Sequence, residues 1–598
     1  MGPTSITPPD WPHWLFVPRR RLPRWSPDRP DRLIFWSDKD GKWDLYAWDR
    51  ALPAVRRVTD RPSGSPLGSP LSWAALSPSG ETIWWFQDTG GDEFGRWMSE
   101  PHDGSAPATP VSLIPPGYPA GIVLAGTYAV ISCLDERGST IWLIPRDETP
   151  RAIRRSDSGV WVTGLSADGG LISLLHAEHG DYRHPAVRVI SPDGRVIADR
   201  WDGPAALLDV GPWAPVGSPA TLVLFREGKG WRAPSIWTPE TDTIEDLEVP
   251  LPGETQHVSW YPDGSALLLI QEFRGRSTPY RLGLEERQLV ALSSEIGTVA
   301  EAAVRPDKEV WVDWSSSTDP GGLYANDESI FQPLAPVSHG VVPYTEFDAD
   351  GLHGFLARPT GRGPLPTILL LHGGPEDHDR DRYCPRVQAW VSQGYVVALV
   401  NYRGSTGYGA QWREANLPDL GFTELRDLAR VRSWLVNAGI SDGRAIGLAG
   451  HSWGGYLVLL GLGTQPDLWS LGIAEAPTAD FTDAHSQEPP WLQGWDRSVF
   501  GGSPMNRSER YQRHSPITYI DRVRAPLLIV GGRRDPRAPQ RQIQRYVDRL
   551  RTLGKAHQVL WHDGGHWCLV TKDLIHILDV EIAFAKRHVI GSSRTGQP

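Results

Sequence analysis

One serine stands between glycines at a point where the chain is expected to turn sharply. Residues 448–460 read LAGHSWGGYLVLL, with Ser452 at the centre of a G-x-S-x-G pattern between two apolar runs. When such a pattern follows a buried strand and precedes a helix, the strained turn exposes the serine hydroxyl at the edge of a sheet. Gly450 and Gly454 allow strand and helix to approach closely. The pattern therefore predicts Ser452 as a nucleophile.

A serine hydroxyl is a weak nucleophile at neutral pH, so it needs a base, and the base needs an orienting carboxylate. On a strand–turn–helix scaffold of this kind the partners follow in the order Asp, then His, each in a loop after a strand. Asp535 follows the apolar run PLLIVGG, and His566 follows HQVLWHDGG. We predict that Ser452, Asp535 and His566 form a catalytic triad.

Three neighbouring residues are weaker candidates for these roles. His562 lies within the last predicted strand rather than in the loop after it. Asp563 is too close in sequence to His566 to make the expected contact, and His451, next to the serine, should point away from it.

An oxyanion formed on Ser452 needs two backbone N–H donors. The N–H of Trp453, at the start of the predicted helix, is the first. The second should come from a loop after an early strand, and LLLHGGPE (369–376) fits this requirement. We assign it to Gly374, with Gly373 as the alternative; the competing interpretation is a simple turn before Pro375.

Strand-like and helix-like segments alternate in the second half of the chain. TILLLHGG (367–374) is a continuous apolar strand of the parallel-sheet type, and RVQAWVSQGY, ELRDLARVRSWLVNAG and RQIQRYVDRLRTLG are helix-like. This alternation predicts a doubly wound, mostly parallel sheet over residues 336–598.

The first half repeats a different plan, expected to span residues 27–335 after an N-terminal extension of residues 1–26. Each unit has an apolar strand, a polar turn and a second strand, and the units recur about every 40 to 45 residues, the period of a four-stranded propeller blade. A β-sandwich array would explain the strands but not the period, so we predict seven blades. The segments are 32–49, 76–100, 124–145, 164–194, 220–242, 258–286 and 303–327.

Composition narrows the classes of function. The net charge of −11 and the lack of a long basic run argue against nucleic acid as a partner. No run approaches the roughly 18 apolar residues that would cross a bilayer, and the first residues lack a secretory signal. The three cysteines show neither a disulfide framework nor metal-ligand spacing. We expect a cytoplasmic protein without membrane partner, cofactor or metal.

The second half closely resembles the prolyl oligopeptidase family of serine peptidases, particularly its acylaminoacyl-peptidase-like branch. The resemblance rests on motifs that cover essentially the whole second half and, more weakly, on blade period and DTGGDEFGRW (88–97) in the first. It implies a seven-bladed β-propeller that caps an α/β-hydrolase, with the same triad between them. The motifs are HGGP (372–375), NYRGSTGYG (401–409), GHSWGGY (450–456), FGGSPMNRSERYQRHSPITY (500–519), PLLIVGGRRDPRAPQRQ (526–542) and HDGGHW (562–567).

The resemblance also implies two substrate-binding residues. Arg537, in DPRAP, matches an arginine that holds a substrate carbonyl, and its alternative is a surface arginine near Asp535. Glu93 matches an acidic position that some members use for a free substrate amine, and its alternative is a salt bridge in a blade turn. The extra Arg534 and the tryptophan-rich stretch 487–500 depart from the family where it lines its specificity pocket, so substrate preference does not carry over.

The sequence favours a peptidase acting on short peptides or on aminoacyl or acylaminoacyl amides through an acyl-enzyme. An amide or ester hydrolase for a peptide-like small molecule is the second interpretation. A propeller interaction protein with an inactive hydrolase domain is the third, and the complete set of expected site residues argues against it. The side-chain preference, exo- or endopeptidase action and the oligomeric state, homo-oligomer included, stay open.

Overall fold

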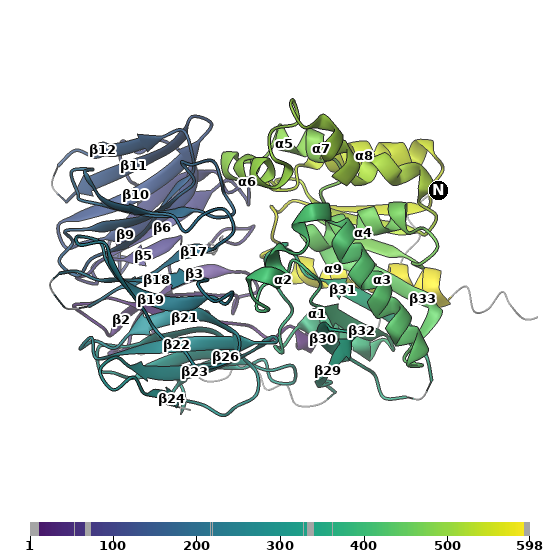
Figure 1. Ribbon diagram of the computed structural model, residues 1–598, viewed down its shortest axis with the longest axis horizontal. Helices are drawn as coiled ribbons and strands as arrows, with labels where there is room; N and C mark the ends of the chain where they lie inside the picture. Colours follow the sequence, from purple (N-terminus) through teal and green to yellow (C-terminus); the bar gives the residue numbers. More distant parts are fainter. Residues whose placement is uncertain are drawn as a thin grey trace, which may run out of the picture.

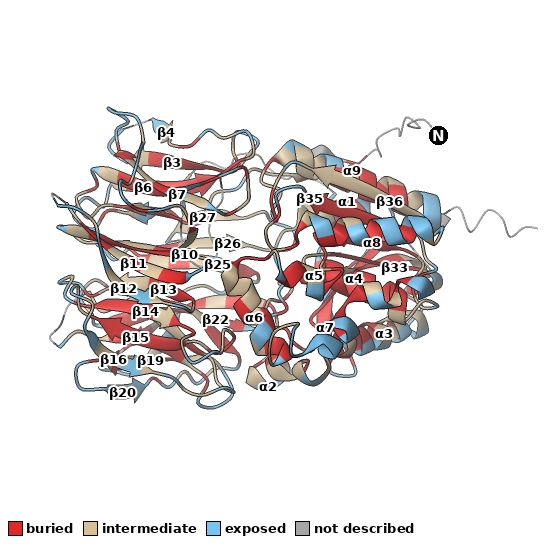
Figure 2. Cartoon of the chain, turned by 90° about the horizontal axis from the view of Figure 1, so that it is seen from above, coloured by how far each residue is buried: buried red, intermediate tan, exposed pale blue. Residues whose placement is uncertain are grey.

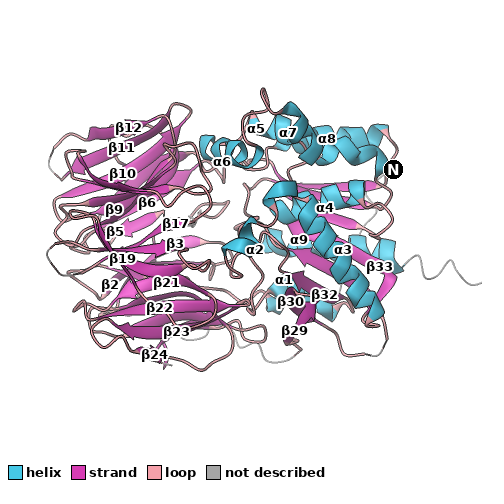
Figure 3. Ribbon diagram, viewed as in Figure 1, coloured by secondary structure: helices cyan, strands magenta, loops and turns pink. Residues whose placement is uncertain are grey.

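The computed structural model describes residues 11–590, apart from residues 53, 66–72, 147, 216, 218, 327, 332–339 and 362. It has two parts side by side, one of strands alone and one in which helices flank a sheet (Figures 1 and 3). The expected boundary between residues 335 and 336 lies outside the described residues.

The first part is a β-propeller. Its described residues form seven four-stranded sheets, each built from consecutive strands, and this confirms the seven blades that the sequence period predicts. The strands are β1 (Arg24–Trp25), β2 (Arg32–Ser37), β3 (Asp44–Asp49), β4 (Val55–Arg57); β5 (Ala74–Leu76), β6 (Thr82–Asp88), β7 (Gly95–Pro101), β8 (Thr109–Pro110); β9 (Tyr118–Leu124), β10 (Tyr128–Asp135), β11 (Gly138–Pro145), β12 (Arg151–Ser156); β13 (Val160–Leu165), β14 (Ile172–His176), β15 (Ala186–Ile190), β16 (Val196–Arg200); β17 (Leu208–Trp213), β18 (Leu222–Arg226), β19 (Ala233–Thr238), β20 (Thr243–Asp246); β21 (Glu254–Trp260), β22 (Ala266–Phe273), β23 (Arg276–Gly283), β24 (Leu289–Ala291); and β25 (Thr298–Val304), β26 (Val310–Ser315), β27 (Gly322–Ala325), β28 (Glu328–Ser329).

Large aromatic side chains fill the spaces between blades. Trp36 and Trp85 pack between the first and second blades, and Trp213 and Trp237 between the fourth and fifth. A buried indole ring removes a large apolar area from water, so each such pair contributes strongly to blade packing. The high tryptophan content of the chain thus has a structural use.

The ring closes by side-chain packing between the last blade and the first. The rings of Trp25 and Trp311 meet edge to face at 5.8 Å, and the Arg305 guanidinium lies 4.6 Å from the Trp311 ring centroid. In the part of the chain that the structure describes, these two blades share no strand. Blade 1 begins at β1, inside the segment expected as an N-terminal extension.

The second part contains an eight-stranded sheet with the order β29-β30-β32-β31-β33-β34-β35-β36. The first two strands pair antiparallel and the strands from β32 to β36 pair parallel, as in a doubly wound sheet. Its strands are β29 (Tyr344–Ala349), β30 (Leu352–Ala357), β31 (Leu365–Leu371), β32 (Val396–Val400), β33 (Ser441–His451), β34 (Gly472–Glu475), β35 (Leu527–Gly532) and β36 (His557–His562).

Helices cover both faces of this sheet. Helices α3, α4 and α8 share one core with it, and α1 and α9 share the core on the other face. Strand β31 contributes Leu369 to the first core and Ile368 to the second, which explains its continuous apolar sequence. The helices are α1 (Pro385–Ser392), α2 (Ala410–Glu414), α3 (Phe422–Asn437), α4 (Trp453–Thr464), α5 (Phe481–His485), α6 (Pro490–Phe500), α7 (Ser508–His514), α8 (Gln540–Thr552) and α9 (Thr571–Ala585).

The inner strands of the blades and most strands of the α/β sheet are largely buried, whereas the outermost blade strands, such as β16 and β20, and the outer faces of the helices are more exposed (Figure 2). Within the described residues, no helix is both long enough and apolar enough to cross a membrane.

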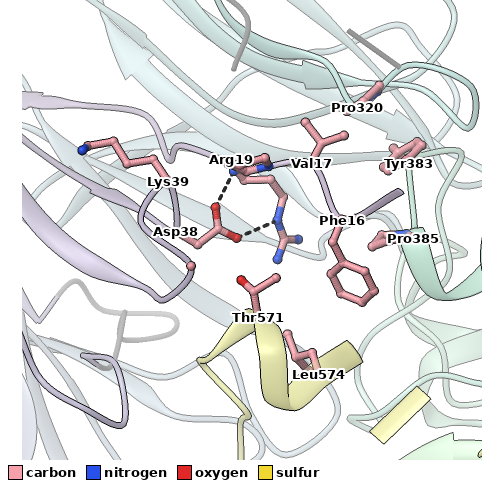
Figure 4. A pocket seen from close by; sticks show the side chains of 12 residues that line it. Phe16, Val17, Arg19, Asp38, Lys39, Pro320, Tyr383, Pro385, Thr571 and Leu574 are labelled. Carbon is pink, nitrogen blue, oxygen red and sulfur yellow. Dashed lines mark hydrogen bonds and ion pairs between the residues drawn. The ribbon is translucent and has the colours of Figure 1, made fainter. Parts of the chain in front are cut away.

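The first described residues join the two parts. Trp11 and Leu15 are buried in the core shared by α1 and α9. The chain then passes to blade 1, where the backbone N–H of Arg19 donates a hydrogen bond to Asp38 and its side chain forms an ion pair with the same carboxylate (Figure 4). A cavity of about 210 Å³ lies beside this crossing, lined in part by Phe16 and Leu574.

Candidate active site

Ser452 occupies the turn between strand β33 and helix α4. Its backbone has φ 57° and ψ −117°, so it lies in a left-handed region that non-glycine residues rarely adopt. A Cβ atom on Gly454 would lie 2.2 Å from the carbonyl oxygen of Leu371, and one on Gly450 would lie 2.6 Å from the Gly454 carbonyl carbon. Only glycine fits at both positions, and the tight turn presents the Ser452 side chain at the sheet edge.

The three residues expected to form a triad come together at this edge. The His566 Nε2 atom lies 3.0 Å from the Ser452 hydroxyl, and the His566 Nδ1 atom lies 2.8 Å from a carboxylate oxygen of Asp535. With Nδ1–H donating to Asp535, Nε2 accepts the hydroxyl proton. This order of contacts lets an imidazole act as a general base for the serine.

Asp535 is held in place by its own loop. Its other carboxylate oxygen accepts hydrogen bonds from the backbone N–H groups of Arg537 at 2.8 Å and Ala538 at 2.9 Å. Burial acts to raise the pKa of Asp535, but the charge of His566 and these hydrogen bonds outweigh it and lower that pKa overall. The carboxylate therefore stays ionised and can stabilise an imidazolium at position 566.

His451 contacts the backbone of the residue expected as base. Its Nε2–H donates a 2.9 Å hydrogen bond to the carbonyl oxygen of His566, and its ring stacks on Trp567 with centroids 4.7 Å apart. Burial lowers the pKa of His451 to about 4, so the ring is neutral near pH 7. In the sequence, His451 was considered only as a candidate base. Its position next to Ser452 did not indicate that it would bind the carbonyl oxygen of His566.

The other two competing candidates have different partners. His562 is in β36, and its Nδ1 accepts a hydrogen bond from the N–H of Gly564 at 3.2 Å. Asp563 lies 3.3 Å from Arg533 in a surface ion pair.

The expected oxyanion donors flank the serine. Trp453 is the first residue of α4, where a backbone N–H has no carbonyl partner within the helix. A Cβ atom on Gly373 would lie 3.6 Å from the Ser452 Cβ atom, so this glycine faces the serine directly. Gly374 follows with φ 118°. Gly373 therefore lies against the serine, and Gly374, the assigned donor, is the next residue, so the assignment of the second donor stays a prediction.

Arg537 and Glu93 are bound to each other. The Arg537 Nε atom lies 2.9 Å from the Glu93 Oε1 atom, across the interface between the α/β part and the loop that joins β6 to β7 of blade 2. Glu93 is buried and has φ 57°. The Arg537 guanidinium also lies 5.3 Å from the ring centroid of Trp491 on helix α6. The two residues expected to bind different substrate groups thus form one site.

Helix α6 forms one wall of this region and touches the propeller. The ring of Trp495 meets that of Trp453 edge to face at 6.1 Å. The Ser498 hydroxyl oxygen accepts a 2.9 Å hydrogen bond from the backbone N–H of Tyr182 in blade 4. The tryptophan-rich stretch singled out in the sequence therefore borders the candidate site.

The loop that carries His566 also packs directly on blade 2. A Cβ atom on Gly91 would lie 2.5 Å from the backbone nitrogen of Gly565, so the two backbones are in close contact. Next to this contact is a cavity of about 730 Å³, lined by Gly90, Arg534 and residues of β36 and α9. Arg534, the extra arginine, thus lies on the side of the loop that faces this cavity.

Comparison with known proteins identifies the α/β part. Residues 382–592 match the family model described as the prolyl oligopeptidase family. The match covers most of the α/β part. Dipeptidyl aminopeptidase BIII of Pseudoxanthomonas mexicana is 30% identical over 208 residues, which are 34% of this chain and 30% of that protein. The acylamino-acid-releasing enzyme of Rattus norvegicus is 27% identical over 259 residues, which are 41% of this chain and 34% of that protein.

The similarity extends to the whole fold. A puromycin-hydrolyzing peptidase of Mycobacterium tuberculosis superposes with a TM-score of 0.80 at 18% identity, covering 98% of both chains. This confirms the combination of a β-propeller with an α/β-hydrolase. The sequence matches, in contrast, span only about a third of the length of the two curated relatives.

Proposed function

We propose that the protein is a serine peptidase that cleaves short peptides or aminoacyl or acylaminoacyl amides through an acyl-enzyme on Ser452. The observation that carries this proposal is the chain of contacts from Ser452 to His566 to Asp535, at 3.0 and 2.8 Å. The match of the α/β part to the prolyl oligopeptidase family model supports it.

In this proposal each side chain and backbone donor of the site has a role in one step of the reaction. His566 takes the proton of Ser452 as the hydroxyl oxygen attacks the substrate carbonyl, and Asp535 stabilises the resulting imidazolium. The N–H groups of Trp453 and of Gly374 or Gly373 stabilise the oxyanion. His566 then gives its proton to the leaving amine, and a water molecule that it activates hydrolyses the acyl-enzyme by the reverse sequence.

The substrate class follows from the Arg537–Glu93 pair and from the names of the relatives. A guanidinium beside the serine can donate to a carbonyl of an acylated substrate, and a carboxylate there can accept from a free amine. The curated relatives include both a dipeptidyl aminopeptidase and an acylamino-acid-releasing enzyme. We place this chain in the acylaminoacyl-peptidase-like branch, in which Arg537 anchors the acyl carbonyl.

Labelling and substrate profiling test the proposal together. The wild-type protein should react with a fluorophosphonate probe and hydrolyse aminoacyl arylamides, whereas Ser452→Ala should do neither and keep the thermal melting profile of the wild type. Puromycin belongs in the substrate panel as an aminoacyl amide, because two structural neighbours carry its name. A labelled Ser452→Ala protein would assign the nucleophile elsewhere, and an unreactive wild type would favour the interaction-protein interpretation.

The proposal also includes the domain bounds and the location of the protein in the cell. We propose the domain boundary between residues 335 and 336, supported by the last propeller strand at Glu328–Ser329 and the first strand of the α/β sheet at Tyr344–Ala349; the propeller domain begins with β1 at Arg24–Trp25, before the expected residue 27. A cytoplasmic location is supported by the three cysteines, all of which are free thiols.

A further inference from the structure

Three side chains with metal-ligating atoms meet where helix α5 leads into helix α6. His485 ends α5, Glu488 lies in the connection, and Asp496 is on the inner face of α6. One ligand atom from each side chain lies within 4.8 Å of the others. The three residues are 9%, 5% and 1% exposed, respectively. The cluster is separate from the candidate triad.

Within the described part of the chain, the two carboxylates of this cluster, Glu488 and Asp496, lack the arginine or lysine partners that buried acids usually have. The Nδ1 atom of His485 lies 3.0 Å from an Asp496 carboxylate oxygen, but the buried Oε2 atom of Glu488 has no hydrogen-bond partner. Among the described residues, neither carboxylate has an arginine or lysine within ion-pair distance. Arg541 pairs instead with Asp483 at 2.8 Å, and the charge of Arg497 acts on Asp496 from beyond ion-pair distance. Burying an unpartnered carboxylate oxygen is costly, and two carboxylates side by side increase that cost.

A cation between the three side chains would remove this imbalance. The geometry points to a bound divalent transition-metal ion, Zn²⁺ in the first place, held by His485, Glu488 and Asp496. An imidazole nitrogen with two carboxylate oxygens suits zinc, manganese or cobalt rather than calcium or magnesium. Ligand atoms around tetrahedral zinc lie about 3.3 Å apart, given bond lengths of about 2.0 to 2.1 Å. The 3.0 Å contact between His485 and Asp496 is close to this spacing, and a ligand atom of Glu488 lies within 4.8 Å of both.

A proton is the alternative to a metal ion between the two acids. Burial, reinforced by the neighbouring Asp496, raises the pKa of Glu488 well above its usual value. Burial also raises the pKa of Asp496, against the lowering effect of His485. A shared proton is therefore the competing occupant, and the experiment must distinguish a proton from a metal ion.

Binding at this point would order the wall of the candidate active site. Helix α6 carries Trp491, which lies against Arg537, and Trp495, which lies against Trp453. A metal ion that ties His485 and Glu488 to Asp496 would fix the start of α6 relative to α5. The site is thus structural, and its existence does not depend on the proposed peptidase activity.

The test uses the full chain, freed of metal by dialysis against a chelator and then titrated with Zn²⁺ or Co²⁺. Wild-type protein should bind one equivalent and melt at a higher temperature with metal than without. Glu488→Gln and Asp496→Asn should each lose that equivalent and the shift. Glu424→Gln is the matched control, because Glu424 is also a fully buried acid but belongs to helix α3 and is bonded to Asn416. It should retain both.

The wild-type protein alone gives a second measurement in case the variants do not fold. In crystals loaded with Co²⁺, an anomalous peak should lie between His485, Glu488 and Asp496, and the absorption spectrum should lack a thiolate charge-transfer band. Loaded crystals without this peak, or a wild type that binds no metal, would overturn the proposal in favour of a shared proton only. Equal binding by wild type and both variants would overturn it as well.

Discussion

Arg537 and Glu93 join the two halves of the molecule, with 2.9 Å between the guanidinium Nε and the carboxylate Oε1. Arg537 comes from the loop that carries Asp535, and Glu93 from the inner end of blade 2. Because the ion pair is largely buried, a substrate carbonyl or amine must either join it or displace one partner. Our proposal therefore gives the propeller a part in substrate recognition, through Glu93.

Replacing Arg537 should separate acylated substrates from small esters. A peptide or N-acylated amino acid offers a carbonyl that the guanidinium can bind, whereas nitrophenyl acetate does not. Arg537→Ala should lower kcat/KM for acylated arylamides by about 1.5 to 3 kcal/mol in transition-state binding, the range of a hydrogen bond to a charged group. Hydrolysis of nitrophenyl acetate should change little.

Arg537→Lys serves as the matched variant. It should restore only part of the loss, because an ammonium group lacks the planar fork of the guanidinium. Equal losses on both types of substrate would mean that Arg537 supports the Asp535 loop rather than the substrate.

Replacing Glu93 should lower kcat/KM for substrates with a free amine relative to N-acylated substrates. Glu93→Gln removes the carboxylate that a substrate ammonium would bind and leaves Arg537 free for a carbonyl. The ratio of kcat/KM for N-acylated over free-amine arylamides should rise about tenfold, the effect of roughly 1.4 kcal/mol. An unchanged ratio with a lower melting temperature would reduce Glu93 to an interdomain ion pair.

The fold was largely predictable because its signals are local. Strand β31 is apolar along its length since both faces are buried, and the blades repeat one strand–turn–strand plan. The Ser452 turn is equally local, with its glycines within two residues of the serine. Asp535 and His566 could be proposed because each follows a parallel strand, and such strands all end at the same edge of the sheet.

Relationships between distant side chains were not predictable in the same way. Glu93 and Arg537 are 444 residues apart, and no pattern in either segment indicates that they pair. The contact of His451 with the His566 carbonyl depends on how the last loop crosses the elbow. The sequence did not single out His485, Glu488 and Asp496, and the turn from α5 into α6 brings them together.

The close contact between Gly91 and Gly565 predicts that the propeller controls the position of His566. Gly91→Ala would place a Cβ atom 2.5 Å from the Gly565 backbone nitrogen and so push the His566 loop away. We expect a loss in kcat of about tenfold to a hundredfold, because small misplacements of reacting groups are costly. The rates of arylamide hydrolysis and of fluorophosphonate labelling would measure it.

Gly180→Ala is the control for backbone strain. Gly180 also has a positive φ, 90° against 103° for Gly91, but nothing lies within 4 Å of the added Cβ atom. Both variants should lose about 1 to 2 kcal/mol of stability from the left-handed backbone, and only Gly91→Ala should lose activity. Similar activity in the two variants would show that the contact does not position His566.

Two buried histidines should make the stability fall as the pH falls. Burial lowers the pKa of both His451 and His372 to about 4, whereas an unfolded histidine has a pKa of about 6.5. Between these values the unfolded chain binds more protons than the folded one, so the free energy of unfolding decreases from about pH 6.5 towards pH 4. Each histidine accounts for on the order of 3 kcal/mol at the lower limit, at 1.36 kcal/mol per pKa unit.

Urea denaturation of wild type and a His451 variant at several pH values would measure how much His451 contributes to the pH dependence of the free energy of unfolding. His451→Phe keeps a ring against Trp567 but cannot titrate, so its stability should depend less steeply on pH than that of the wild type. If His451→Phe shows the wild-type slope, the imidazole of His451 is not held neutral in the folded protein, and its contact with the His566 carbonyl would have to be formed by the protonated ring.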